Sequence, residues 1–328
     1  MEKIITDFLG QLKIGRKQSF KNLSMYPLLS NYYVTFDYDT LDDALDKKSI
    51  EILEVAKEGS VPELKVINKS STMVLILDGE ELVGAKQNRI VNTTILVPGD
   101  STIIIPVSCV EQGRWSYNSE AFATEERMMS SNLRAMKSQH VNYSVREEGK
   151  FRSDQGALWE EISEKARRHD AAAPSMAMSE IYENEKPLLK EYIDGFSNTE
   201  SQMGAVFMIN GKIAGMDCFG KPETFLSVFK KLVGSYALDA IDWIKEEKEF
   251  KVLKSEVTKF IKETSKANIE TQKSVGEGID CRLETKKITG FTLCYGDQIP
   301  HMSVFLKADN DKPNSRMQRF SNRRQYTI

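Results

Sequence analysis

The sequence predicts an α+β fold whose N-terminal third is β-rich and sandwich- or barrel-like, with helices and further antiparallel strands added to it. Three observations predict this class. Short runs of β-branched and aromatic residues fill residues 24–116, and apolar residues recur with helical spacing over 119–200. A hairpin, a helix and more strands follow over 203–307.

These segments are expected to form a single domain over residues 15–307. Ile5, Phe8 and Leu12 recur with helical spacing between charged residues, which predicts an N-terminal amphipathic helix within residues 1–14 that packs on the core. Residues 308–328 are polar and basic, and we expect them to form a flexible tail.

Composition excludes several classes of function. The chain has 328 residues, of which 40% are apolar and 28% charged, with a net charge of -3. This balance is typical of globular proteins and gives no general attraction to nucleic acid or to anionic membranes. No apolar run approaches the roughly 18 residues of a membrane span, and no signal peptide is recognisable, so we expect a cytoplasmic location. Four cysteines without a CxxC pair predict reduced core thiols rather than disulfides or a zinc site.

The β-rich third is expected to begin with short strands that a helix interrupts. Thr40 is followed by acidic residues, which predicts the N-cap of that helix. The expected strands are YYVTF (32–36), SIEILEVA (49–56), ELKVIN (63–68) and TMVLIL (72–77).

A hairpin is predicted next, with Pro98 to Ser101 as its turn. This register places Val97 opposite Thr102 and Ile90 opposite Cys109, within a slip of a residue or two. Pro106 cannot donate a backbone hydrogen bond, so its strand is expected at an edge or a bulge.

The remaining two thirds are expected to mix helices with strands. Residues 138–156 are polar and predict a long loop, whereas Asn210-Gly211 predicts the turn of a second hairpin. Pro222 opens the clearest helix, and residues 252–266 predict a lysine-rich surface helix. Further strands are expected at 279–285, 288–295 and 301–306.

The stretch GEELVGAKQNRIVN, residues 79–92, places charged and amide side chains between two apolar runs. The predicted hairpin brings it beside SCVEQGRW, residues 108–115, so that two polar stretches form one patch at the open end of the hairpin. Burying many unpaired charges is costly, so the patch faces solvent, pairs internally or lines a wet pocket. Its candidate site residues are Glu80, Glu81, Lys86, Gln87, Asn88, Arg89, Asn92, Cys109, Glu111, Arg114 and Trp115.

This mixture of side chains suits a ligand that carries phosphates, hydroxyls and an aromatic base. Arg and Lys bind phosphate, carboxylates accept from ribose hydroxyls, and Trp stacks on a base. Glu80, Glu81 and Glu111 are the candidate catalytic residues, as a general base or as ligands of a divalent metal. The alternative is a solvated strand end whose surface ion pairs each contribute about 0–1 kcal/mol.

Several of these residues have a second interpretation. Strand alternation would put Lys86 and Arg89 on opposite faces, so both contact one ligand only if this segment is a loop or bulge. Cys109 is a nucleophile only with a depressed pKa and a nearby base such as His301; a buried strand cysteine is the expected alternative. Arg114 beside Trp115 either grips a phosphate or forms a salt bridge with Glu111.

The two polar stretches resemble the signature of a known family. LDGEELVGAKQNRIVNTTILVP followed by IPVSCVEQGRW is similar to the ARG- and rhodanese-phosphatase-superfamily-associated protein domain. TLDDALDKKSIEILEV and SVPELKVINKS resemble its opening, and SDQGALWEEI, GAVFMINGKIAGMDCFG and HMSVF resemble its later blocks. The likeness covers most of the chain. Cys218 and the basic tail are mild departures from the family pattern.

The resemblance implies a link to ADP-ribosylglycohydrolases and to NAD and ADP-ribose metabolism, without an established reaction. Asp217 and His301 lie in the later blocks and join the candidate ligand-binding residues. Asp217 is either a metal ligand together with Glu80 or Glu81, or a local cap.

Three functions remain open at this stage. The chain is an enzyme that hydrolyses an ADP-ribose- or NAD-derived nucleotide, a module that senses such a nucleotide without chemistry, or a protein that docks a partner through the polar patch. Cations interleaved with aromatics in the tail could bind single-stranded nucleic acid. A basic tail without this function is the prediction. The sequence leaves the oligomeric state open.

Overall fold

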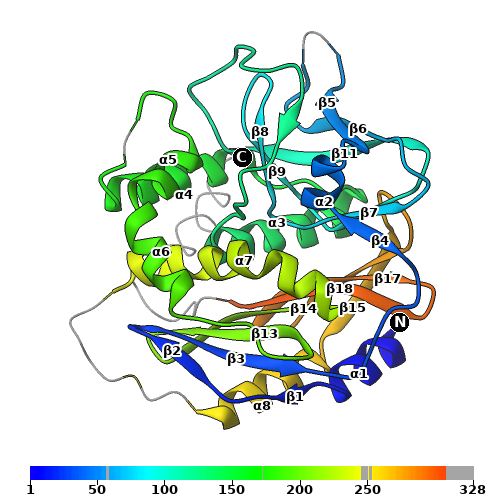
Figure 1. Ribbon diagram of the computed structural model, residues 1–328, viewed down its shortest axis with the longest axis vertical. Helices are drawn as coiled ribbons and strands as arrows, with labels where there is room; N and C mark the ends of the chain where they lie inside the picture. Colours follow the sequence, from blue (N-terminus) through cyan, green and yellow to red (C-terminus); the bar gives the residue numbers. More distant parts are fainter. Residues whose placement is uncertain (57–58, 172, 245–249, 251–252, 308–328) are drawn as a thin grey trace, which may run out of the picture.

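The computed structural model describes residues 1–56, 59–171, 173–244, 250 and 253–307. The basic tail expected over 308–328 lies outside the described residues. Figure 1 shows three layers: a large sheet, a layer of helices above it, and a second β-rich region on top.

The large sheet has nine strands, and all of its pairings are antiparallel. Its order is β1-β3-β13-β14-β18-β17-β16-β15, with β2 paired to β3. Asn210 and Gly211 join β13 to β14 with φ of 50° and 75°, the left-handed turn that the dipeptide predicts. The strands are β1 (Lys13–Ile14), β2 (Gln18–Phe20), β3 (Leu23–Leu29), β13 (Gln202–Ile209), β14 (Lys212–Phe219), β15 (Asn268–Lys273), β16 (Ile279–Glu284), β17 (Ile288–Tyr295) and β18 (Gln298–Leu306).

Helices cover both faces of this sheet (Figure 1). The N-terminal helix α1 (Glu2–Gly10) and the lysine-rich helix α8 (Lys254–Thr264) pack on one face, together with alternate residues such as Val206. Helices α3 (Ser131–Glu148) and α7 (Pro222–Asp242) pack on the other, together with Phe207. The two-residue period of strands explains why Val206 and Phe207 belong to different cores.

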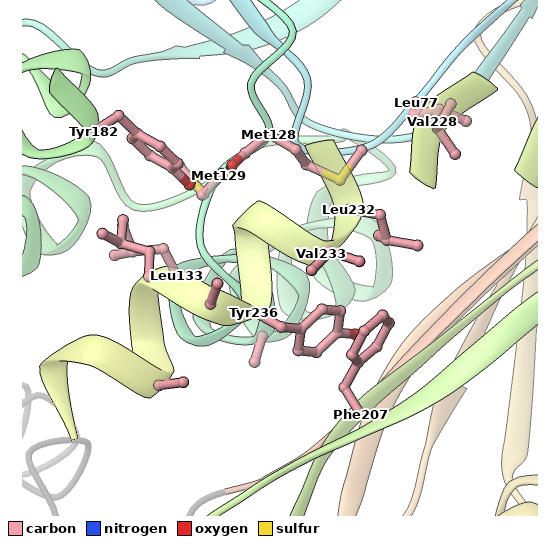
Figure 2. Packing of buried hydrophobic residues seen from close by; sticks show 14 of the residues in the cluster. Leu77, Met128, Met129, Leu133, Tyr182, Phe207, Val228, Leu232, Val233 and Tyr236 are labelled. Atoms are coloured by element: carbon pink, nitrogen blue, oxygen red, sulfur yellow. Dashed lines mark hydrogen bonds between the residues drawn. The ribbon is translucent and has the colours of Figure 1, made fainter. Parts of the chain in front are cut away.

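The helical layer joins the sheet to the upper region (Figure 2). Tyr236 of α7 stacks on Phe207 of the sheet with ring centroids 4.0 Å apart. Met128 and Leu77, from the segments above, belong to the same core. The side of this layer is formed by α4 (Gln155–Arg168), α5 (Met178–Asn184) and α6 (Lys186–Asp194).

The upper region contains a six-stranded sheet in the order β12-β8-β9-β11-β6-β5. A β-bridge between Leu53 and Ala121 joins its two ends, so the sheet nearly closes into a barrel. A three-stranded sheet, β10-β7-β4, and the short helix α2 (Leu41–Asp46) share the apolar core of this barrel. The strands are β4 (Tyr38–Thr40), β5 (Ile50–Glu54), β6 (Glu63–Asn68), β7 (Met73–Ile76), β8 (Glu81–Gly84), β9 (Arg89–Val91), β10 (Ile95–Val97), β11 (Ser101–Cys109) and β12 (Phe122–Ala123).

Many of the expected elements are confirmed. Thr40 caps α2 through a reciprocal capping box with Asp43. Pro222 opens α7, and the apolar stripe of that helix is buried. All four cysteines are free and buried.

Two of the expected local structures are wrong. YYVTF is no strand; Val34 donates to the carbonyl of Gly220 (3.0 Å) and Thr35 to Oε1 of Gln298 (2.8 Å), so distant groups hold this segment in an irregular path. Residues 138–148 belong to α3 rather than to a loop. This helix is polar because it buries charged and hydroxyl side chains whose partners lie elsewhere in the chain, such as Lys137 beside Asp78.

The predicted hairpin is also only partly correct. Val97 pairs with Val74 of β7, and the first half of β11 pairs with β6, so the two strands flanking the Pro98 turn belong to different sheets. Farther along, β11 does pair with β9, and Cys109 lies opposite Arg89, one residue from the predicted register. Pro106 lies in an internal strand, at the point where pairing with β6 ends and pairing with β9 begins.

None of the helices in the described part of the chain is both long and apolar enough to cross a membrane.

Candidate functional site

The two polar stretches meet at one end of the barrel, as predicted. Residues 85–88 form a turn between β8 and β9, and Ala85 has φ of 39°. The backbone N–H of Val110 donates to the carbonyl of Asn88 (3.1 Å), which fixes the turn against the end of β11. Most of the candidate side chains here are buried, so the patch pairs internally rather than facing solvent.

Glu111 and Arg114 form the centre of this internal pairing. Arg114 donates from Nε to Oε1 of Glu111 (2.8 Å) and from Nη2 to Oε2 (2.7 Å). It also donates to the carbonyl of Ala85 (2.7 Å) and to Oδ1 of Asn88 (3.2 Å). Arg114 therefore holds the turn in place, and its bidentate contact occupies the Glu111 carboxylate.

Gln87 and Cys109 extend the same network. The side chain of Gln87 donates to the carbonyl of Glu111 (2.9 Å) and accepts from Arg89 (3.1 Å). The thiol of Cys109 lies 3.2 Å from Oε1 of Gln87. Burial raises the pKa of Cys109, which disfavours the thiolate that a nucleophile needs. His301 lies in a different cluster, so the geometry favours the buried strand cysteine.

Asn92 links the strand to neighbouring segments. Its amide donates to the carbonyl of Phe151 (3.0 Å), and its Oδ1 accepts from Ser108 (2.8 Å). Both hydrogen-bonding ends of this amide are therefore engaged within the protein.

Glu80 and Glu81 differ sharply in their partners. Glu80 accepts from the backbone of Leu77 (2.7 Å) and forms a buried ion pair with Lys231, which also binds Asp42. Neither carboxylate oxygen of Glu81 has a hydrogen-bond partner among the described residues; Nε of Arg127 lies 3.9 Å away. Burial raises the pKa of Glu81 to about 7, against the opposing charge of Arg127.

The exposed part of the patch is a group that we name the Trp115 platform: Lys86, Trp115 and Tyr117. Trp115 is 48% exposed and Tyr117 is 52% exposed. The ammonium of Lys86 lies 5.2 Å from the ring centroid of Trp115 and 5.1 Å from that of Tyr117. The buried guanidinium of Arg89 lies 5.8 Å from the Trp115 ring. Because residues 85–88 form a turn, Lys86 and Arg89 both contact this ring, which meets the condition set by the sequence.

Asp217 and His301 do not reach the patch. They lie in the large sheet beneath α3, where Asp217 accepts from Arg134 (2.5 and 3.2 Å), Ser303 (2.8 Å) and Tyr236 (2.8 Å). Burial opposes ionisation of Asp217, but Arg134 and His301 outweigh it and lower the pKa of Asp217. His301 stacks on Phe219, and burial lowers its pKa.

Two cations in this second cluster were missed from the sequence. Arg134 and Lys137 of α3 are fully buried, and Lys137 contacts Asp78 and the carbonyl of Val91 (3.1 Å). Burial lowers the pKa of Lys137 to about 8, with Asp78 opposing the shift. Arg134 and Lys137 lie in a segment that is too polar to predict a helix packed in the core. Their charges therefore did not indicate buried partners.

Glu54 and Arg127, beside the polar patch, were also missed. Glu54 follows Ile50 and Ile52 on the inward-facing positions of β5, so a charge on an apolar stripe could have identified it. Arg127 had no such pattern. Its contacts with Glu81 and Glu183 arise only when distant segments meet.

No group of three or more His, Cys, Asp or Glu side chains is placed to hold a metal ion within the part of the chain that the structure describes. The carboxylates proposed as metal ligands are separated: Glu80 lies with Lys231, Asp217 with Arg134, and Glu81 near Arg127.

Comparison with known proteins identifies the family. A family model for the ARG and Rhodanese-Phosphatase-superfamily-associated Protein domain matches residues 11–305. The chain belongs to this family. The match includes both polar stretches and the Asp217 cluster. No curated protein and no solved structure matches the chain.

Arg89 and Glu81 lie on different faces of the barrel wall. Leu82 pairs with Arg89 and Glu81 pairs with Ile90, so Arg89 and Glu81 project from opposite faces of β8–β9. Arg89 points to the barrel interior beneath the Trp115 platform, and Glu81 points toward Arg127 on the helical side. A ligand seated on the platform therefore does not contact Glu81 from the same side.

Proposed function

We propose that this protein binds an ADP-ribose- or NAD-derived nucleotide on the Trp115 platform and acts as a nucleotide-sensing module. The observation that carries the proposal is a half-exposed Trp115 ring with two cations, Lys86 and Arg89, within 6 Å of its centroid. An exposed ring stacks on a base, and a neighbouring ammonium attracts phosphate.

Other observations support binding over catalysis at this position. Of the three candidate catalytic carboxylates, Glu80 is paired with Lys231, Glu111 is held by Arg114, and Glu81 lies on the opposite face of the strands. The family name associates the chain with ARG and rhodanese-phosphatase-superfamily proteins. This association supports the choice of an ADP-ribose-related ligand.

Direct binding measurements test the proposal. The wild-type protein is titrated by calorimetry with ADP-ribose, NAD and AMP, and the melting temperature is followed in parallel. Trp115→Ala is expected to weaken binding roughly tenfold or more, because base stacking contributes about 1–3 kcal/mol. Trp243→Ala is the matched control, since Trp243 is also partly exposed but lies at the end of α7. Absence of binding, or equal binding by Trp115→Ala, contradicts the proposal.

A second candidate function is hydrolysis with Glu81 as the proton acceptor. It is favoured by the Glu81 oxygens, which have no hydrogen-bond partner among the described residues, and by a pKa of about 7, which suits a general base at neutral pH. The mass of each nucleotide is followed during incubation with and without Mg²⁺ and Mn²⁺. A mass change that Glu81→Gln abolishes supports the enzyme, whereas an intact ligand supports the sensor.

A further inference from the structure

Beneath the Trp115 platform lies an ion pair that the contacts above leave unexplained. Glu54 is the last residue of β5 and Arg89 the first of β9. Glu54 is 7% exposed and Arg89 is fully buried. Both occupy the end of the barrel interior, in line with the apolar residues of the barrel core.

The two groups are close but incompletely paired. Nη2 of Arg89 lies 3.8 Å from Oε1 of Glu54, which is too far for a hydrogen bond. Both oxygens of Glu54, and Nε and Nη2 of Arg89, have no hydrogen-bond partner among the described residues. Buried charges without hydrogen bonds are costly, so this arrangement suits a polar group that bridges the pair.

The chemistry of the pair selects the bridging group. A hydroxyl donates to the Glu54 carboxylate and accepts from the Arg89 guanidinium, so it satisfies both partners at once. A phosphate is repelled by Glu54, and an ammonium is repelled by Arg89. The site therefore suits a neutral hydroxylated group, and a vicinal diol offers one hydroxyl for each carboxylate oxygen.

The Trp115 platform is the exposed group nearest to the ion pair on this side of the barrel wall. The Trp115 ring covers Arg89, and about half of that ring remains exposed. Gly59, with φ of 77°, lies against two of the three platform residues: a Cβ there would lie 3.0 Å from Cδ of Lys86 and 3.2 Å from Trp115. The backbone thus packs closely against one side of the platform.

We propose that Glu54 and Arg89 bind the ribose hydroxyls of the nucleotide whose base and phosphates lie on the Trp115 platform. This assignment rests on the proposed function. It makes Glu54 a specificity-determining residue that selects nucleotides with an intact ribose diol.

The test changes the ligand and the protein separately. Wild-type protein is titrated with ADP and with 2′,3′-dideoxy-ADP, which needs no variant to fold. Glu54→Gln, which keeps the shape of the side chain, is titrated with the same pair, and its fold is checked by circular dichroism. D-ribose alone, at millimolar concentration, is the third probe, read by the melting temperature.

Loss of the diol is expected to weaken binding to the wild type roughly ten- to a hundred-fold, because hydrogen bonds to charged groups are lost. Glu54→Gln is expected to bind both nucleotides with similar, weakened affinity. Equal binding of ADP and 2′,3′-dideoxy-ADP by the wild type overturns the assignment while leaving nucleotide binding intact.

The D-ribose measurement distinguishes a failure of this assignment from a failure of the proposed function. If no nucleotide binds but D-ribose raises the melting temperature of the wild type and not of Glu54→Gln, the diol site stands and the nucleotide proposal fails. If none of the three probes binds, both are overturned, and a structural water satisfies the ion pair.

Discussion

Two buried carboxylate–guanidinium pairs in this protein differ in how well they are satisfied. Asp217 and Arg134, in the large sheet, make a bidentate contact, and Ser303 and Tyr236 complete the hydrogen bonds of the carboxylate. Glu54 and Arg89, at the barrel end, lie 3.8 Å apart, and both oxygens of Glu54 lack a partner among the described residues.

The difference shows that residue type and burial alone do not indicate whether a charged pair stabilises the fold or binds a ligand. A carboxylate whose hydrogen bonds are complete holds segments together: Asp217 joins β14 to α3, β18 and α7. A carboxylate without hydrogen bonds among the described residues, beside a guanidinium that lies under an exposed aromatic ring, has capacity left for a ligand. Measurements on Asp217, Glu81 and Glu54 test this contrast.

The largest effect is expected at Asp217. Asp217→Ala leaves the buried Arg134 guanidinium without its main partner, and we expect the free energy of unfolding to fall by about 3–5 kcal/mol. Urea denaturation monitored by circular dichroism measures the change. A loss below about 1 kcal/mol would break the comparison, because Asp217 would then be no more important than a surface charge.

Glu81 is expected to show an intermediate effect that depends on pH. Its folded pKa of about 7 is above the ordinary value of 4.5, so the native state holds a proton that the unfolded state releases first. The contribution of Glu81 is therefore favourable below about pH 4.5 and is lost as the pH rises to about 7, by up to about 3 kcal/mol.

Denaturation of Glu81→Gln between pH 4 and pH 8 tests this sign. The variant, which carries no titrating carboxyl, should gain stability relative to the wild type as the pH rises and should match it near pH 4. A difference that is constant across the range would show that Glu81 keeps an ordinary pKa.

The smallest effect is expected at Glu54. The side chain of Glu54 makes no hydrogen bond within the described residues, so Glu54→Gln should change the free energy of unfolding by less than about 1 kcal/mol without ligand. The same denaturation assay compares it with Asp217→Ala. A cost of about 3 kcal/mol would mean that Glu54 stabilises the fold as Asp217 does, and the contrast between the two pairs would disappear.

Some features of the site could be predicted from residue patterns, and others could not. The two polar stretches come together because β9 and β11 pair with a register only one residue from the predicted one. The sequence offered a salt bridge between Arg114 and Glu111 as one of two alternatives and could not choose between them, because that contact depends on the turn at Ala85. The family resemblance added Asp217 and His301 to the candidate ligand-binding residues without placing them in space, and the large sheet and α3 hold them in a separate cluster.

Local residue patterns were enough to predict many of the helices, strands and turns of this protein. Asn210-Gly211 set a hairpin turn, Thr40 capped a helix, Pro222 opened α7, and alternating apolar residues formed β5 and β6. These features depend on backbone preferences and on neighbours within a few residues, so a local pattern is enough to predict them.

Other features of the fold and of the site depend on contacts between distant segments. The tertiary structure made a helix of the polar segment that ends α3, and it separated β10 from β11. It left the Glu54 carboxylate without a hydrogen-bond partner among the described residues while completing the partners of Asp217. The physical reason is that a buried charge is stable only with partners, and here those partners lie tens to hundreds of residues away. Arg134 meets Ser303 and Lys137 meets Asp78 only when the sheet, the helices and the barrel pack together.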